Sequence, residues 1–313
     1  HVRCDEKFKS ELMALPEQPI AVMVPAWQEW AVIRKMVELA ASSFDYGHYH
    51  LFIGTYPNDE KTQSAVDEVV RLYDNVHKVV TRDPGPTTKA DCLNNVIEAI
   101  SEFEREHQIH FAIISYHDAE DVIHPLELKV FNYFIPNYDL LQLPVFPLPR
   151  PRRRLIANHY MDEFGEAHCK DMVVREALTG NVPSAGVGTA FSRRAISTLE
   201  ALNDHQVFDT GSLTEDYQIG FRLHERGLKA HFALLAVPRE KVPYISVREY
   251  FPASIKQAVR QKSRWIVGIV FQGWRSLGWS RQLRLSYILM RDRKAVLTNP
   301  TNLVGYFIVV NIV

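Results

Sequence analysis

The stretch Phe111-Ala112-Ile113-Ile114-Ser115-Tyr116-His117-Asp118-Ala119-Glu120-Asp121 decides the expected fold, because an apolar run ends in an acidic cluster. Residues 111–115 are typical of a buried strand. Similar runs occur earlier in the chain, at residues 20–26, 49–55 and 76–81. Segments with helical spacing alternate with these runs, at residues 30–42, 62–73 and 89–103. This alternation predicts βαβ units and an α/β fold with a mostly parallel central sheet.

The second half of the chain is less regular, but some segments have clear patterns. Residues 140–148 predict a strand, residues 158–178 a helix, and the glycine-rich residues 180–191 a loop. Residues 253–277 mix Lys and Arg with Ile, Val, Phe and Trp at helical spacing. A helix of this kind can lie on a membrane surface, with its charged face in water and its apolar face at the acyl boundary.

Composition limits the classes of partner. The chain has 313 residues, and its formal net charge of −1 does not favour nucleic acid as a partner. Its three cysteines, Cys4, Cys92 and Cys169, form no C-x-x-C pair. This argues against a disulfide framework and against a structural zinc site.

The C-terminal residues 303–313 are almost wholly apolar. The run is shorter than the roughly 20 residues that span a bilayer, so we expect it to be the start of a transmembrane helix. The missing initiator Met at His1 also indicates that the natural chain is longer. Five basic residues lie between Arg281 and Lys294 and would face the cytoplasm. The alternative is a buried C-terminal helix or strand.

Polar side chains follow the expected strands at the edge where parallel sheets bind ligands. They are Trp27 and Glu29, Asn58 and Asp59, and Asp118 and Glu120. Residues separated by one position in an extended turn point the same way, so Asp118 and Glu120 can face one ion. Carboxylate oxygens suit Mg²⁺ or Mn²⁺. The alternative is an acidic turn exposed to solvent.

Thr214-Glu215-Asp216 opens an expected helix that runs to about Arg226. Asp216 is the candidate general base, because a positioned carboxylate can take the proton of an attacking hydroxyl as a new bond forms. Glu215 is adjacent, so only one of the two carboxylates is expected to face the cleft. Thr214 can cap the helix and the two acids suit the positive end of its dipole, so capping alone is the alternative role.

Gln261-Lys262-Ser263-Arg264-Trp265 is the third motif. At helical spacing, Gln261 and Arg264 lie on one face of a helix. The guanidinium of Arg264 can hold a diphosphate through two hydrogen bonds, and Trp265 offers a flat apolar face to a sugar. The alternative is an interfacial helix with a snorkelling Arg and an anchoring Trp.

The three motifs, in this order, resemble the D-x-D, T-E-D and Q-x-x-R-W series of processive family 2 glycosyltransferases, the group of cellulose, chitin and hyaluronan synthases. The resemblance covers about residues 20 to 275, and Glu120 replaces the second Asp of D-x-D. Residues 24–29 resemble the family's V-P-x-x-x-E segment, which lines the nucleotide base, and residues 89–94 its K-A-x-x-L-N segment. Whether Asn58 or Asp59 contacts the base stays open.

The resemblance implies a GT-A fold at residues 1–250, membrane-interface helices at 251–302 and the start of a transmembrane helix at 303–313. It implies an inverting enzyme in which Asp118 and Glu120 hold Mg²⁺ or Mn²⁺ against a UDP-sugar. Asp216, or Glu215, would be the base, with Arg264 on UDP and Trp265 on the acceptor. Other substrate contacts would come from the matched positions Pro25, Trp27, Glu29, Asn58, Asp59, Lys89 and Gln261.

A narrower resemblance rests on V-P-A-W-Q-E, the turn at residues 56–59 and H-D-A-E-D. It is to a bacterial inner-membrane subfamily that is taken to make a secreted glycan from a cytoplasmic catalytic domain. It implies a UDP-N-acetylhexosamine donor such as UDP-N-acetylmannosamine, a glycan acceptor, an outer-membrane export partner and cyclic-di-GMP regulation outside this chain. Alternatives are a non-processive transferase that acts on a lipid-linked sugar, and a receptor or scaffold without catalysis.

Overall fold

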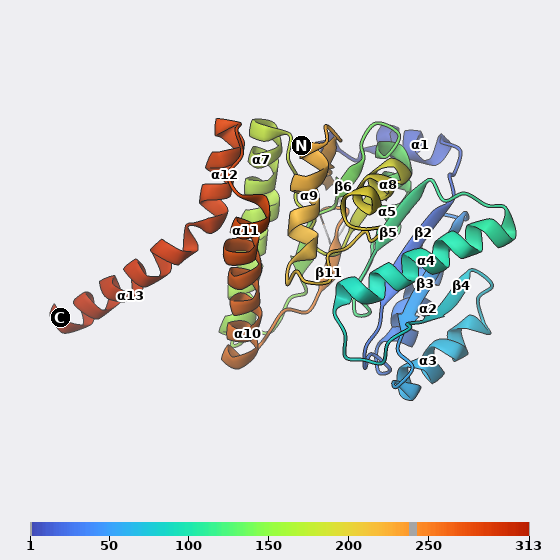
Figure 1. Ribbon diagram of the computed structural model, residues 1–313, viewed down its shortest axis with the longest axis horizontal. Helices are drawn as coiled ribbons and strands as arrows, with labels where there is room; N and C mark the ends of the chain where they lie inside the picture. The colour runs from blue at the N-terminus through green and yellow to red at the C-terminus, as the bar shows by residue number, and fades with distance from the viewer. Residues whose placement is uncertain (1, 238–242, 313) are drawn as a thin grey trace.

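The computed structural model describes residues 2–237 and 243–312, and its centre is a seven-stranded sheet between two layers of helices (Figure 1). Across the sheet the strands are β4 (Val76–Val80), β3 (Tyr49–Thr55), β2 (Ile20–Pro25), β5 (Ile113–Tyr116), β8 (Thr189–Ser192), β6 (Leu140–Gln142) and β9 (Ala230–Phe232). Only β8 runs antiparallel to its neighbours in this sheet. The predicted α/β fold with a mostly parallel sheet is therefore confirmed.

The central strand β2 shows why both faces of the sheet are covered. Ile20, Val22 and Val24 are fully buried on one face, and Ala21 and Met23 on the other. The first face packs against helices α1 (Glu6–Ala14), α2 (Ile33–Ser43), α3 (Glu60–Val70) and α5 (Glu127–Phe134). The second packs against α4 (Lys89–His107), α8 (Arg193–Leu202) and α9 (Glu215–Glu225). A ligand can therefore reach the sheet only at the ends of its strands.

The predicted strand at residues 140–148 is two strands. β6 ends at Gln142, and β7 (Val145–Pro147) leaves the main sheet to pair in parallel with β11 (Val247–Glu249). Pro144 lies between them and has no N–H for a ladder hydrogen bond, which suits the break. A further short pair joins β1 (Val2–Arg3) to β10 (Leu235–Ala236). The predicted loop at residues 180–191 ends in β8.

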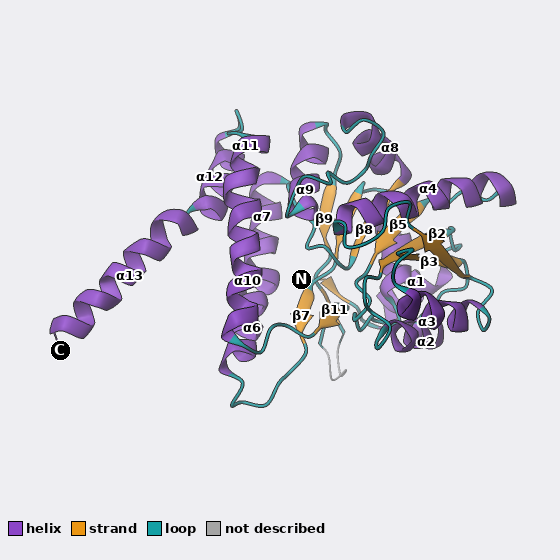
Figure 2. Ribbon diagram, turned by 60° about the horizontal axis from the view of Figure 1, so that its bottom comes forward, coloured by secondary structure: helices purple, strands orange, loops and turns teal. Residues whose placement is uncertain are grey.

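Long helices stand beside the sheet (Figure 2). The predicted helix at residues 158–178 is confirmed as α6 (Leu155–Glu166), a π-helical turn η1 (Ala167–Asp171) and α7 (Met172–Thr179). The predicted helix at residues 253–277 is α10 (Ile255–Trp265), a second π-helical stretch η2 (Ile266–Gln272) and α11 (Gly273–Leu277). These last three elements expose large apolar side chains: Ile255, Val259, Val267, Phe271 and Trp274.

The C-terminal helices are α12 (Leu283–Arg293) and α13 (Ala295–Ile312), and α13 projects away from the rest of the molecule (Figure 1). Its 18 residues are about 27 Å long, close to the roughly 30 Å of a bilayer core. By length and composition it is the one helix within residues 2–237 and 243–312 that could cross a membrane. It starts before the predicted apolar run at 303–313, and Val313 lies outside the described residues.

His168 in η1 gives this fold a predictable response to acid. It is only 6% exposed, and its Nδ1 accepts a hydrogen bond from the backbone N of Val145 at 2.7 Å. Burial lowers the pKa of His168 from 6.5 to about 4. The folded chain therefore keeps this imidazole neutral in a pH range where the unfolded chain binds a proton.

We expect the free energy of unfolding to fall by roughly 3 kcal/mol through His168 as the pH drops from 6.5 to about 4, because only the unfolded state is protonated in that window. His168→Gln, which can still accept from Val145, should remove this part of the pH dependence. His159→Gln, on exposed α6 surface, is the control. Thermal unfolding followed by circular dichroism would measure the effect, and equal pH slopes in all three proteins would contradict it.

Candidate functional site

The acidic turn after β5 is fixed by a buried histidine. His117 lies 3.0 Å through Nδ1 from Asp121 Oδ2 and 2.6 Å through Nε2 from Glu127 Oε1. Burial alone would lower its pKa, but the carboxylates of Glu127 and Asp121 raise it to about 10. Asp121 Oδ2 also accepts a hydrogen bond from the backbone N of Asp118 at 2.9 Å. The last acid of the cluster is thus structural, and it leaves Asp118 and Glu120 available for a ligand.

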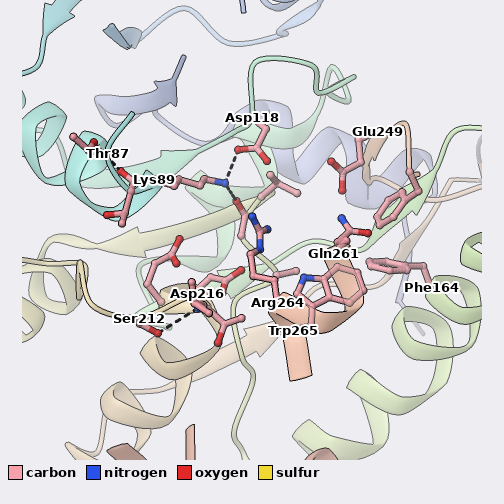
Figure 3. A pocket seen from close by; sticks show the side chains of 18 residues that line it. Thr87, Lys89, Asp118, Phe164, Ser212, Asp216, Glu249, Gln261, Arg264 and Trp265 are labelled. Atoms are coloured by element: carbon pink, nitrogen blue, oxygen red, sulfur yellow. Dashed lines mark hydrogen bonds and ion pairs between the residues drawn. The ribbon is translucent and has the colours of Figure 1, made fainter. Parts of the chain in front are cut away.

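Two cavities meet at this turn. The first has a volume of about 310 Å³, and Figure 3 shows Lys89, Asp118, Asp216, Arg264 and Trp265 around it. The second, of about 620 Å³, shares Asp118 and Arg264 with the first. It also contains Glu120. The structure therefore brings the three predicted motifs, which are far apart in sequence, to one site.

The predicted site residues divide between the cavities and their surroundings. Those that line at least one cavity are Lys89, Asp118, Glu120, Glu215, Asp216, Gln261, Arg264 and Trp265. Those that line neither are Pro25, Trp27, Glu29, Asn58 and Asp59. The predicted nucleotide-base contacts thus lie beside the cavities and not in them.

Lys89, at the start of α4, crosses the first cavity. Its Nζ donates to Asp118 Oδ1 at 2.5 Å and to the backbone O of Gly186 at 3.0 Å. Burial opposes the charged form, but Asp118, and more weakly Glu215 and Asp216, raise the pKa of Lys89. The ammonium is therefore charged, and in this structure it contacts the acidic turn, whereas the predicted role is contact with the nucleotide and its phosphates.

Glu215 and Asp216 start α9 and both line the first cavity, so the expectation that only one of them faces the cleft is wrong. Burial and the charge of Asp216 raise the pKa of Glu215 to about 7. Burial also raises the pKa of Asp216, while Lys89 and Arg264 oppose the rise. Gly186 has φ +83°, and a Cβ there would come within 2.6 Å of Asp216 Oδ2. Glycine is thus needed for both the turn and the close approach.

The predicted capping role of Thr214 is wrong. Its side chain makes no capping hydrogen bond, and its Oγ1 is buried without a partner among the described residues. Thr214 packs instead on Gly268 of η2, where a Cβ would come within 2.5 Å of it. The loop before it is held by Gln272, which donates to Gly211 O at 3.2 Å and accepts from Leu213 N at 2.8 Å. The end of η2 therefore positions the start of α9.

Local contacts hold the predicted base-contact residues in place. The side-chain amide of Asn58 bonds the backbone N and O of Gly85 at 2.7 and 2.6 Å. Asp59 caps α3 and accepts from the backbone N of Gln28 at 2.6 Å. Trp27 packs edge-on against Tyr56, with ring centroids 5.0 Å apart. Both candidate side chains at the turn are therefore committed to local hydrogen bonds in this state.

Glu29 completes this group. Burial raises its pKa, as do the charges of Asp118 and Asp59, in that order. It therefore lies within electrostatic range of both the acidic turn and the residues beside Trp27. Glu29 thus links the predicted base contacts to the predicted metal ligands electrostatically.

Two charged side chains of the larger cavity, Glu249 and Arg150, are not among the predicted site residues. Burial and then the charges of Asp121 and Asp118 raise the pKa of Glu249 well above its usual value. Glu249 is the last residue of β11, and Arg150 follows the end of β7. Sequence periodicity does not reveal this short pair, because each strand has three residues. The basic run that starts at Arg150 is visible in the sequence. Its place beside the acidic turn is visible only in the structure.

The carboxylates of the larger cavity suit a divalent cation. Asp118, Glu120 and Glu249 offer hard oxygen atoms, and their mutual repulsion contributes to the raised pKa values of Glu120 and Glu249. Within residues 2–237 and 243–312, no three acidic, imidazole or thiol groups already converge to hold an ion. The oxygen atoms of Asp118, Glu120 and Glu249 fit Mg²⁺ or Mn²⁺ when a ligand supplies further oxygen atoms, which is the usual arrangement for Mg²⁺.

This chain belongs to glycosyltransferase-like family 2, whose sequence profile matches residues 16–268. It is 51% identical to bacteriophage adsorption protein B of Escherichia coli strain K12, over 96% of this chain and 42% of that protein. The same figures hold for bacteriophage N4 adsorption protein B of E. coli O157:H7. The chain thus spans about two fifths of the length of these curated relatives. The predicted resemblances to family 2 and to this subfamily are confirmed.

Solved structures support the fold. The mannosyltransferase PcManGT of Pyrobaculum calidifontis, in complex with GDP-Man and Mn²⁺, has a TM-score of 0.64 at 16% identity, over 94% of this chain and 77% of that one. Residues 1–349 of S. aureus TarS give a TM-score of 0.52 at 11% identity, over 89% and 70%. The predicted GT-A fold is confirmed, and the chain is a glycosyltransferase domain.

We expect Gln272→Ala to lower the rate of sugar transfer by about 10- to 100-fold, because a shifted 211–214 loop misplaces the acids at the start of α9. Donor affinity should change little, since Gln272 lines neither cavity. Arg275→Ala, on the exposed side of α11, is the control. Steady-state kinetics with separate donor titration would test this, and an unchanged kcat would show that η2 does not position the loop.

Proposed function

We propose that this protein is an inverting, metal-dependent glycosyltransferase that moves a sugar from a UDP-sugar to a growing exopolysaccharide at the bacterial inner membrane. The observation that carries the proposal is the meeting of Asp118, Asp216 and Arg264 in one cavity. These are a metal-binding acid, a base and a diphosphate-binding cation. The complex of the related fold PcManGT with GDP-Man and Mn²⁺ supports a nucleotide-sugar donor and a metal ion.

On the donor side, Asp118 and Glu120 would hold Mg²⁺ or Mn²⁺, with Glu249 close by. The ion supplies Lewis-acid neutralisation of the diphosphate leaving group. Arg264 would bind the same diphosphate through its planar guanidinium. The nucleotide base of the donor would lie beside the cavities. We propose that it contacts the predicted positions Pro25, Trp27, Glu29, Asn58 and Asp59.

On the acceptor side, Asp216 would take the proton of the attacking hydroxyl. Burial and the charge of Asp216 raise the pKa of Glu215, whereas the charges of Lys89 and Arg264 favour the ionised form of Asp216. A single base suits direct displacement with inversion. Trp265 packs near Phe164, with ring centroids 6.0 Å apart, and both line the cavity with Phe251. This aromatic wall suits the apolar face of a sugar ring.

The membrane assignment rests on the C-terminal half. Ile255 and Val259 of α10 and Val267 and Phe271 of η2 are exposed, and α13 has no buried residue, so these apolar surfaces need a partner. We propose that α13 enters the bilayer and that Arg281–Lys294 lies on the cytoplasmic side. The division into a catalytic domain at 1–250, interface helices at 251–302 and a membrane segment from 303 remains part of this proposal.

The proposal also covers the identity of the donor, the acceptor and the partners. A UDP-N-acetylhexosamine such as UDP-N-acetylmannosamine is the first donor to test, with a glycan as the acceptor. Export partners and cyclic-di-GMP regulation would act through regions outside this chain. The name of the curated relatives favours one other candidate function, a role in phage adsorption that does not need catalysis.

The deciding experiment is a UDP-release assay on membranes that contain the full-length protein, with a panel of UDP-sugars. We expect release with one UDP-N-acetylhexosamine, dependence on Mn²⁺ or Mg²⁺, and loss in excess EDTA and in Asp118→Asn. Full activity in excess EDTA would show that sugar transfer does not need a metal ion. No turnover with any nucleotide sugar, while phage still adsorbs, would favour the receptor.

We expect Asp216→Asn to bind UDP-sugar nearly normally and to turn over about 10²- to 10⁴-fold more slowly, because an amide cannot accept the proton. Glu215→Gln is the matched variant one residue away and should lose less. Single-turnover kinetics at saturating donor would measure both. If Asp216→Asn keeps most of its rate while Glu215→Gln loses it, the base is Glu215.

A further inference from the structure

We propose that Arg150 is a second diphosphate-binding guanidinium of the donor site, in addition to Arg264. Arg150 lines the larger cavity together with Asp118, Glu120 and Arg264. It belongs to none of the three sequence motifs. This inference rests on the proposed function, since it names a further contact to the same nucleotide donor.

The short strands place Arg150 beside the acidic turn. Val122, which follows the turn, exchanges backbone hydrogen bonds with Arg248 of β11, at 2.7 and 2.9 Å. Leu148, which follows β7, donates its backbone N to Glu249 O at 2.7 Å. The backbone therefore links the turn to β11, and β11 to the segment that carries Arg150. The charge of Arg150 acts on Glu120, where it opposes the rise in pKa that burial causes.

The guanidinium of Arg150 is oriented but not neutralised. It lies over the ring of Tyr250, 3.9 Å from the centroid. Within the part of the chain that the structure describes, Arg150 forms no ion pair, and its Nε is buried without a hydrogen-bond partner. A planar guanidinium held on an aromatic ring loses little freedom when it binds, and its fork matches phosphate oxygens.

The charges of the site favour a diphosphate as the ligand of Arg150. A divalent cation and the ammonium of Lys89 together bring three positive charges, which the carboxylates of Asp118, Glu120 and the ionised base Asp216 balance. Lys89 is already bonded to Asp118. The two negative charges of a sugar nucleotide's diphosphate are then left to Arg150 and Arg264. A neutral sugar would instead need the aromatic wall and neutral hydrogen bonds of the other cavity.

The neighbouring arginines supply a matched control. Arg152, Arg153 and Arg154 continue the same basic run, but they are exposed and line neither cavity. A general electrostatic effect of the run would act through all of them. A specific contact would act through Arg150 alone.

The test is isothermal titration of the purified full-length protein with UDP and with inorganic pyrophosphate, each with Mn²⁺. Arg150→Gln should weaken both ligands about 10- to 100-fold, because a hydrogen-bonded charge pair is lost. Arg150→Lys, which keeps the charge but not the planar fork, should fall between Arg150→Gln and the wild type. Arg153→Ala should stay within about twofold of the wild type.

Three results would overturn the inference. Arg150→Gln could bind UDP as tightly as the wild type, or Arg153→Ala could lose as much affinity as Arg150→Gln. The third is a loss of UDP affinity with unchanged pyrophosphate affinity, which would assign Arg150 to the nucleoside. If the wild type binds neither ligand, the proposed donor class itself fails, and this outcome is distinct from the other three.

Discussion

The repulsion among carboxylates at the ends of β5 and β11 and at the start of α9 is the constraint on which this site depends. Asp118, Glu249 and Asp216 come from three separate parts of the chain, and each feels the charge of another. Lys89 links these groups, because its ammonium bonds Asp118 and stabilises the ionised forms of Glu215 and Asp216. The excess of carboxylates in this site favours the binding of a metal ion.

The scaffold holds this charge in place with elements from both halves of the chain. The buried His117 is charged, and its contacts with Asp121 and Glu127 fix the acidic turn. From the other side, Gly268 and Gln272 of η2 hold the loop before α9. The stretch η2 that holds this loop also exposes the apolar side chains of Val267 and Phe271.

The fold was predictable because its strands and helices have strong local patterns. The buried runs at 20–26 and 49–55 became β2 and β3, because a strand covered on both faces is largely apolar. The run at 76–81 became the edge strand β4, which is only partly buried. The strand at 140–148 was predicted too long, since its residues are apolar in either sheet and only Pro144 marks the change. Thr214 was assigned a cap because its residue type suits one, whereas packing on Gly268 determines its role.

The sequence by itself determined the α/β class, the family and the three motifs, because these depend on short segments whose residue types have specific chemistry. Only the tertiary structure decided how the motifs meet. It placed Lys89 on Asp118, put Glu249 and Arg150 at the edge of the acidic turn, and tied Asn58 and Asp59 into local hydrogen bonds. These contacts join residues far apart in sequence, and their energies depend on burial and distance, which no local pattern encodes.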